Sequence, residues 1–287
     1  MPRTLHAEPV VRDRAHLNES PLWDDRHQVL RWVDILAGHV HSWDPATGER
    51  TLFEAGLPVG AVALREAGGL VLAVADGFEI LEDGRTTRIA DLDSEGGDLR
   101  MNDAVCDAEG RLLAGTMAYS HEPGRGTLHR LDPDHTVHTA LPEVTISNGL
   151  DWSPDGRTAY YADSPTREVR AYRYHEGGLL EPRPFAAPEG GVPDGLAVDA
   201  EGGVWVAVAF AGTVCRYLPD GTLDTVVRVP ATVTTSCAFG GPGLDTLYIT
   251  TATENLTPAQ LAEQPLAGGI FACTPGVRGR RAHRFRG

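Results

Sequence analysis

One short residue pattern recurs six times along this 287-residue chain. Each copy begins with a small or polar anchor residue, continues through a short apolar run and a turn rich in Asp and Gly, and ends with a second apolar run. The clearest copy begins at Asn148 and reads NGLDWSPDGRTAYYAD. The six anchors lie 41 to 46 residues apart and are Glu19, Gly60, Asn102, Asn148, Asp194 and Thr235. A period near forty residues is typical of proteins built from blades or solenoid coils.

Each copy of the repeat predicts four β-strands. The apolar runs last about four to eight residues, are rich in Val, Leu, Tyr and Trp, and are separated by Gly, Pro and Asp, which is the pattern of strands and tight turns. Only TPAQLAEQ, which starts at Thr257, predicts a helix, of one or two turns. An open solenoid needs polar capping repeats, and the sequence shows none. We therefore predict an all-β fold, a six-bladed β-propeller with four-stranded antiparallel blades.

The two ends of the chain are expected to close the ring. A strand in EPVVRDRA (residues 8–15) is predicted to complete the last blade, beside GIFACT (residues 269–274) and RAHRFR (residues 281–286). Because the repeat leaves no place for a boundary, the sequence predicts a single domain over residues 1–287.

Charge and composition narrow the functional classes. A formal net charge of −15 disfavours nucleic acid and anionic membranes as partners. No apolar stretch has the length of a signal peptide core or a membrane span, which favours a cytoplasmic protein, expected as a monomer or weak homo-oligomer. The four cysteines stand apart in the sequence, so neither a disulfide framework nor a zinc site is expected.

Strand direction places the anchors and the second turn of each repeat at the same end of the propeller. That end is expected to gather the polar residues Glu19, Arg100, Asn102, Asn148 and Asp194, whose oxygens suit a hard divalent cation. Taken singly, Asn148 and Asp194 precede Gly and also fit ordinary turns, and Glu19 also fits a solvated loop carboxylate. Their equivalent positions in different repeats favour a common site. The small anchors Gly60 and Thr235 are predicted to leave room for a substrate.

Several motifs, matched in order, resemble the senescence marker protein (regucalcin) and gluconolactonase family over nearly the whole chain. They are ESPLWDDRHQVLRWVDI, RMNDAVCDAEGRLLAGTM, ISNGLDWSPDGRTAYYADS, PDGLAVDAEGGVWVA and TSCAFGGPGLDTLYITTA. The resemblance implies hydrolysis of sugar lactones by a six-bladed propeller that holds one divalent cation through Glu19, Asn148 and Asp194. It also implies that Arg100 and Asn102 bind substrate hydroxyls.

The chain departs from the family pattern after GTM, where it reads GTMAYSHEPGRG. Tyr119 and Ser120 stand where animal members of the family have an acidic pair that touches the sugar. We predict that Tyr119 binds substrate, by stacking on a sugar or by donating from its hydroxyl, although a loop aromatic that covers the rim fits equally well.

The mechanism expected from these residues is metal-dependent hydrolysis of a sugar lactone to its aldonic acid. The cation, which is Ca, Mg, Mn, Zn or Fe, polarises the lactone carbonyl and activates water, and Asp194 is both a ligand and the general base. Two alternatives stay open: another divalent-metal ester or phosphotriester hydrolase, and a noncatalytic calcium-binding module. The absence of a GxSxG motif from the sequence disfavours a serine nucleophile.

Overall fold

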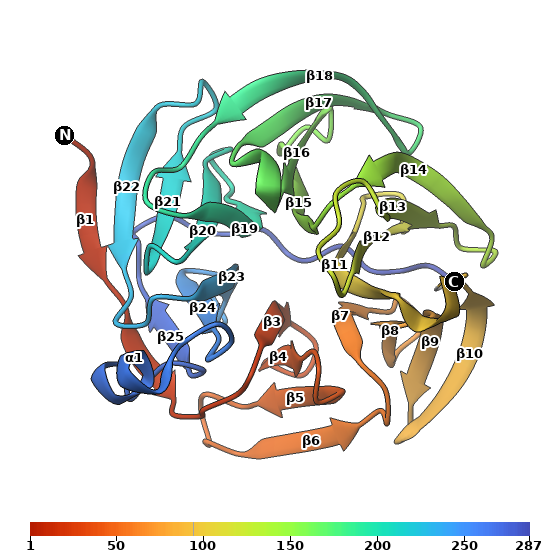
Figure 1. Cartoon of the computed structure of the whole chain (residues 1–287), viewed down its shortest axis with the longest axis horizontal. Coiled ribbons are helices and arrows are strands. Elements are labelled where there is room, and N and C mark those ends of the chain that lie inside the picture. The colour runs from red at the N-terminus through yellow and green to blue at the C-terminus, as the bar shows by residue number, and fades with distance from the viewer. Residues whose placement is uncertain (94) are drawn as a thin grey trace.

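The computed structural model describes residues 1–93 and 95–287. Its strands form six sheets arranged around a common axis, which confirms the predicted six-bladed β-propeller (Figure 1). From the axis outward, blade 1 contains β3 (Asn18–Asp24), β4 (Val29–Asp34), β5 (His39–Trp43) and β6 (Arg50–Glu54). Blade 2 contains β7 (Val59–Leu64), β8 (Leu70–Val74), β9 (Gly77–Glu82) and β10 (Arg85–Asp91). Blade 3 contains β11 (Leu99–Cys106), β12 (Leu112–Ala118), β13 (Gly126–Leu131) and β14 (Val137–Val144).

The other three blades follow the same plan. Blade 4 contains β15 (Ser147–Trp152), β16 (Thr158–Asp163), β17 (Val169–His175) and β18 (Gly178–Ala186). Blade 5 contains β19 (Val192–Val198), β20 (Val204–Ala209), β21 (Thr213–Tyr217) and β22 (Leu223–Arg228). Blade 6 contains β23 (Thr234–Gly240), β24 (Thr246–Thr251) and β25 (Ile270–Cys273). The expected short helix is α1 (Pro258–Glu263), and two 3₁₀ turns span Glu95–Gly97 and Ser164–Thr166.

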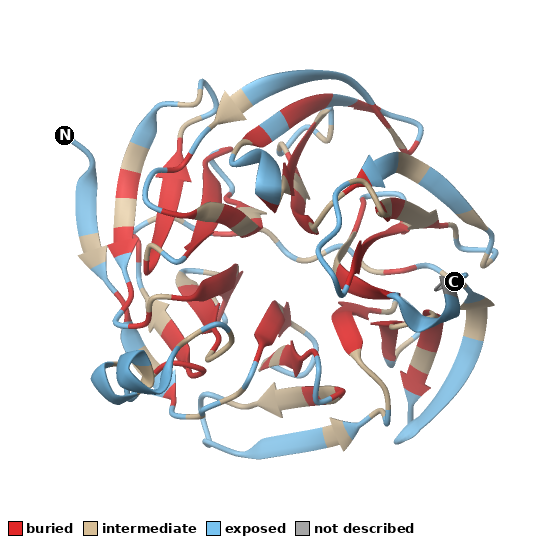
Figure 2. Ribbon diagram, in the orientation of Figure 1, coloured by how far each residue is buried: buried red, intermediate tan, exposed pale blue. Residues whose placement is uncertain are grey.

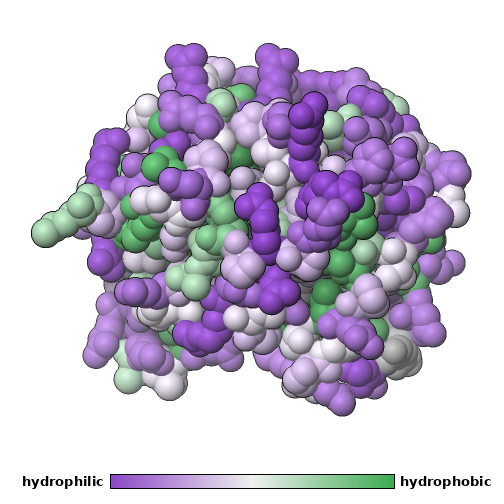
Figure 3. Space-filling model, turned by 90° about the horizontal axis from the view of Figure 1, so that it is seen from above, coloured by the Kyte–Doolittle hydropathy of each residue, from purple (hydrophilic) through white to green (hydrophobic). Residues whose placement is uncertain are grey.

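Burial decreases from the axis outward in each blade (Figure 2). The two inner strands of blade 2, β7 and β8, are buried at every position, whereas β10, with the sequence RTTRIAD, is exposed along most of its length. Polar side chains on such outer strands protect their free edges from pairing with other chains. From the side, the ring is mostly hydrophilic, with small separate hydrophobic areas (Figure 3). Among the described residues, no helix has the length and apolarity to span a membrane.

The N-terminal segment closes the ring. Strand β2 (Glu8–Val11) pairs antiparallel with β25, so the predicted N-terminal strand does complete the last blade. The strand before it, β1 (Arg3–His6), adds a fifth strand to blade 5 by pairing parallel with β22. The sequence did not predict this second contact, through which the N-terminal segment joins blades 5 and 6.

The prediction that RAHRFR joins the last blade is wrong. This sequence belongs to the C-terminal segment (residues 274–287), which passes behind the blades in Figure 1. The backbone N of Phe285 donates to the carbonyl of Leu64 in blade 2, at 2.8 Å. One reason is that β2 already occupies the edge of β25. The other is that the Phe285 side chain is fully buried in an apolar cluster with Ala63 and Leu112.

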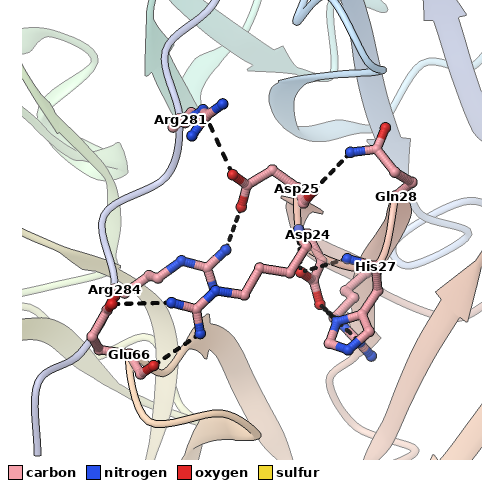
Figure 4. A network of polar contacts seen from close by, with 9 residues as sticks. Asp24, Asp25, His27, Gln28, Glu66, Arg281 and Arg284 are labelled. Atoms are coloured by element: carbon pink, nitrogen blue, oxygen red, sulfur yellow. Dashed lines mark hydrogen bonds and ion pairs between the residues drawn. The ribbon is translucent and has the colours of Figure 1, made fainter.

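Ion pairs also hold the C-terminal segment against the first blade. Asp25, in the turn after β3, lies between Arg281 and Arg284 (Figure 4). Next to it, Asp24 accepts hydrogen bonds from His27 and Arg31. This turn lies at the end of β3 opposite the anchor Glu19, so the C-terminal segment covers the end of the propeller that is remote from the anchors.

Candidate functional site

A β-bulge interrupts the innermost strand of every blade at the anchor. The shift in pairing register begins at the anchor or one residue before it in all six strands. The shifts fall between Glu19 and Leu22, Val59 and Ala61, Met101 and Ala104, Ser147 and Leu150, Pro193 and Leu196, and Thr234 and Cys237. A bulge releases residues from the regular ladder and redirects their side chains. Polar anchors of different blades can therefore meet near the axis instead of lying on the face of a sheet.

Hydrogen bonds join the anchors of blades 3 and 4. Nη1 of Arg100 donates to Oδ1 of Asn102 at 2.7 Å, and Nδ2 of Asn102 donates to Oδ1 of Asn148 at 2.9 Å. Nδ2 of Asn148 then donates to Oγ of Ser164 at 2.7 Å, and this hydroxyl donates to the carbonyl of Pro193 at 2.7 Å. The chain of hydrogen bonds thus runs from Arg100 to the residue that precedes Asp194.

These partners fix the orientation of both amide groups. The single hydroxyl hydrogen of Ser164 goes to the carbonyl of Pro193, which can only accept, so Ser164 must accept from Nδ2 of Asn148. Likewise, Nδ2 of Asn102 donates to the carbonyl of Ser147 at 2.9 Å. Oδ1 of Asn148 therefore faces Asn102 and keeps one lone pair beyond the hydrogen bond that it accepts.

Two carboxylates complete the set of polar anchors. The side chain of Glu19 is buried, and its Oε2 accepts a hydrogen bond from the backbone N of Ser20 at 2.8 Å. Burial, together with repulsion from Asp194 and Asp103, raises the pKa of Glu19 well above its usual value. Burial, together with repulsion from Asp103 and Glu254, does the same to the pKa of Asp194. The site therefore concentrates negative charge where water solvates it poorly, and this arrangement favours a bound cation.

The donor atoms fit a hard divalent cation. Glu19 and Asp194 offer carboxylate oxygens, and Asn148 offers an amide oxygen, which are ligands that calcium and magnesium prefer. Within residues 1–93 and 95–287, no three His, Cys, Asp or Glu side chains form a group that could hold a metal ion. The candidate ligands are two carboxylates, Glu19 and Asp194, and the amide of Asn148. This set lacks the His and Cys ligands typical of zinc.

Arg100 and Tyr119 lie together beside these anchors. The Arg100 guanidinium carbon lies 5.9 Å from the centroid of the Tyr119 ring, which is a cation–π contact. Tyr119 directly follows the end of β12. Arg100 is buried, whereas Tyr119 is 46% exposed. Tyr119 is thus the solvent-facing member of the pair.

A cavity of about 90 Å³ lies inside the propeller on the other side of the anchors. Ser20, Asp103 and Ser236, which each follow an anchor, line one part of it, and Ala282 and His283 of the C-terminal segment line another. Burial raises the pKa of Asp103 to about 6. Because the C-terminal segment covers that end, a substrate is expected to enter from the anchor end, where Tyr119 is exposed.

The expectation that Gly60 and Thr235 leave room for a substrate is wrong. A Cβ atom on Gly60 would lie 2.5 Å from the carbonyl carbon of Met101, so the backbone of the next blade fills that space. Thr235 is buried, and its hydroxyl hydrogen-bonds with the carbonyl of Asn18 at 2.5 Å, which joins blade 6 to blade 1. Both small anchors serve the packing of neighbouring inner strands.

Sequence analysis missed two residues of this site, Ser164 and Glu254. Ser164 follows β16 and supports Asn148, and Glu254 follows β24 and interacts electrostatically with Arg100 and Asp194. Both lie in the second turn of their repeat, which the strand directions place at the anchor end. A polar residue in that turn was therefore the signal that could have identified them.

The fold and its axial site define a class, the six-bladed propellers with a polar centre, and comparison with known proteins identifies the family. Residues 17–253 match the family described as SMP-30/Gluconolactonase/LRE-like region. The chain is 38% identical to regucalcin of Xenopus laevis over 297 residues, which cover 99% of each protein. It is also 38% identical to a 6-deoxy-6-sulfogluconolactonase of Pseudomonas putida over 286 residues, which cover 97% of this chain and 98% of the relative.

A solved structure extends the similarity to three dimensions. The calcium-binding protein regucalcin of Agrobacterium tumefaciens matches with a TM-score of 0.95 and 27% identity, over 100% of both chains. The chain therefore belongs to the SMP-30/gluconolactonase/LRE-like family. The gluconolactonase names within this family support a lactone hydrolase.

Proposed function

We propose that the protein hydrolyses a sugar lactone to the corresponding aldonic acid, with one divalent cation held by Glu19, Asn148 and Asp194. The observation that carries this proposal is the mutual repulsion of two carboxylates, the buried Glu19 and the half-buried Asp194, both with raised pKa values. Holding two negative charges together is unfavourable unless a cation compensates them. The sulfogluconolactonase among the relatives supports a lactone as the substrate.

Asp194 is assigned two roles, as a ligand and as the general base. When bound, a divalent cation supplies a Lewis acid that polarises the lactone carbonyl and lowers the pKa of a nearby water. The Asp194 carboxylate takes a proton from the attacking water as its oxygen bonds to the carbonyl carbon. The ester bond between that carbon and the ring oxygen then breaks, and the ring oxygen receives the proton as the aldonic acid forms. Glu19 is assigned to the cation alone.

Arg100, Asn102 and Tyr119 are assigned to substrate binding. Nη1 of Arg100 is engaged by Met101 and Asn102, at 2.9 and 2.7 Å, which holds the guanidinium as a fixed donor for lactone hydroxyls. Both hydrogens of the Asn102 amide are already engaged, so Asn102 can offer a substrate only a remaining lone pair on Oδ1. The exposed Tyr119 ring offers a face on which a sugar can stack.

The identity of the cation is proposed on the same grounds. Oxygen ligands favour Ca, Mg or Mn over Zn or Fe, and the solved regucalcin of A. tumefaciens is described as calcium-binding. Affinity for each ion in solution, measured by calorimetry on metal-free protein, ranks these candidates.

The direct test of the proposed function is a substrate panel measured after chelation and after readdition of each metal. The panel contains sugar lactones, aryl esters and phosphotriesters. We expect turnover of a sugar lactone that disappears with the chelator and returns with a divalent cation. Turnover confined to aryl esters or phosphotriesters would assign a different hydrolase, and cation binding without turnover of any compound would leave a calcium-binding module.

A further inference from the structure

Glu254 lies in a turn whose backbone is fixed against the start of the first blade. The backbone N of Glu254 donates to the carbonyl of His16 at 3.1 Å, and Oγ1 of Thr253 donates to the carbonyl of Ala15 at 2.9 Å. Ala252 also pairs with Leu17 in an isolated bridge. These contacts hold Glu254 close to the segment that leads into Glu19.

The carboxylate of Glu254 interacts electrostatically with residues of the site but accepts no hydrogen bond from those that the structure describes. The negative charge of Glu254 acts to raise the pKa of Arg100 against the lowering caused by burial, and its repulsion helps to raise the pKa of Asp194. The side chain is 31% exposed, and its Oε1 lies 3.8 Å from Nε2 of His16. Across the part of the chain that the structure describes, no group donates a hydrogen bond to this carboxylate. Its acceptor positions are therefore available to a ligand.

We infer that Glu254 is a specificity-determining residue, which accepts hydrogen bonds from lactone hydroxyls while Arg100 donates to others, and which disfavours lactones with an anionic substituent. The inference rests on the proposed function and adds to it a residue from blade 6. A hydroxyl both donates and accepts, so a ring that carries several hydroxyls is matched by a carboxylate and a guanidinium acting together.

The balance of charge in the site explains why lactones with an anionic substituent are disfavoured. The site contains four carboxylates: Glu19, Asp194 and Glu254 interact electrostatically with the guanidinium of Arg100, and Asp103 repels Glu19 and Asp194. A divalent cation and Arg100 together offset only three of these four negative charges when all are ionised. A phosphate or sulfonate group on the substrate would therefore meet net repulsion, to which the partly exposed Glu254 contributes.

The test compares three lactones in kcat/KM: neutral glucono-1,5-lactone, anionic 6-phosphogluconolactone and δ-valerolactone, which has no hydroxyls. Glu254→Gln is expected to lower the preference for gluconolactone over valerolactone about tenfold or more, because a hydrogen bond to a charged group becomes a neutral one. The same variant should reduce the discrimination against the phosphorylated lactone. Glu254→Asp, which keeps the charge, should retain that discrimination.

Glu263→Gln is the matched control, because Glu263 is an exposed residue at the end of α1 and its substitution removes the same charge. It should leave both ratios at their wild-type values. Unchanged ratios in a folded Glu254→Gln variant, with a wild type that hydrolyses lactones, would overturn the inference and leave the proposed function standing. Absence of hydrolysis of all three lactones by the metal-loaded wild type would contradict both.

Discussion

Nδ2 of Asn102 donates a hydrogen bond of 2.9 Å to Oδ1 of Asn148, and this contact links blade 3 to blade 4 at the anchor end of the propeller. The same Oδ1 is the atom that we assign to the cation. Asn102 thus orients a proposed ligand as well as lying beside Arg100. The two assigned functions of the site, cation binding and substrate binding, share one hydrogen-bond chain.

Asn102→Ala is therefore expected to affect both functions. It removes the donor to Asn148 and the acceptor of Arg100, so KM should rise and cation affinity should fall. Loss of hydrogen bonds worth about 0.5–3 kcal/mol corresponds to roughly 2- to 150-fold. Steady-state kinetics and a calorimetric cation titration measure the two effects. Wild-type values in both would remove Asn102 from the site.

Ser164→Ala tests the support behind Asn148. The substitution leaves Nδ2 of Asn148 and the carbonyl of Pro193 without their partner in a buried place, which costs about 1–3 kcal/mol of unfolding free energy. The amide of Asn148 also becomes free to rotate, so cation affinity should fall. Urea unfolding and cation titration give the two values. Ser120→Ala, at an exposed position, is the control and should change neither.

The fold could be predicted from the sequence because its cause is local and repeated. Six similar copies bury their apolar inner strands by stacking around an axis, and the N-terminal segment supplies the fourth strand of the last blade. The meeting of Asn102 with Asn148 followed from their equivalent positions in neighbouring copies. Register in the repeat was therefore enough to predict which anchors come together.

The contacts that could not be predicted depend on what lies beside a residue in space. From the sequence, Gly60 was predicted to leave room for a substrate, but the backbone of Met101 occupies the space next to it. Strand β1 pairs with β22 and Phe285 packs between blades 2 and 3, although neither segment belongs to the repeat. Such contacts depend on which edges and apolar pockets remain open after the blades have formed, and residue types alone do not specify them.

Removal of residues 1–14 is expected to destabilise the whole ring. The deletion exposes the edges of β22 and β25 and removes the buried side chain of Val11, which alone contributes about 1.5–3 kcal/mol. Thermal unfolding should shift to lower temperature as one transition. Deletion of residues 1–2, which precede β1, is the control. An equally stable protein without residues 1–14 would contradict the closure of the ring by its N-terminal strands.

Acid should destabilise the protein in part through His129. Burial lowers the pKa of His129 to about 4, below the value near 6.5 expected in the unfolded chain. Between these values the unfolded chain binds a proton that the folded protein does not, so stability falls as the pH falls from about 6.5 to 4. His129→Gln should reduce the fall of the melting temperature with falling pH over this range, whereas His175→Gln, at an exposed position, should leave that fall unchanged. Parallel profiles for wild type and His129→Gln would exclude this contribution.

The central claim is that Asp194 is both a cation ligand and the general base of a lactonase. Its most direct test is the rate of hydrolysis of a sugar lactone by Asp194→Ala with saturating divalent cation, alongside circular dichroism. Asp220→Asn, in an exposed turn of the same blade, serves as the control. The account predicts that Asp194→Ala keeps the β-sheet spectrum and loses turnover, while the control retains both. Turnover near the wild-type rate in Asp194→Ala would contradict it.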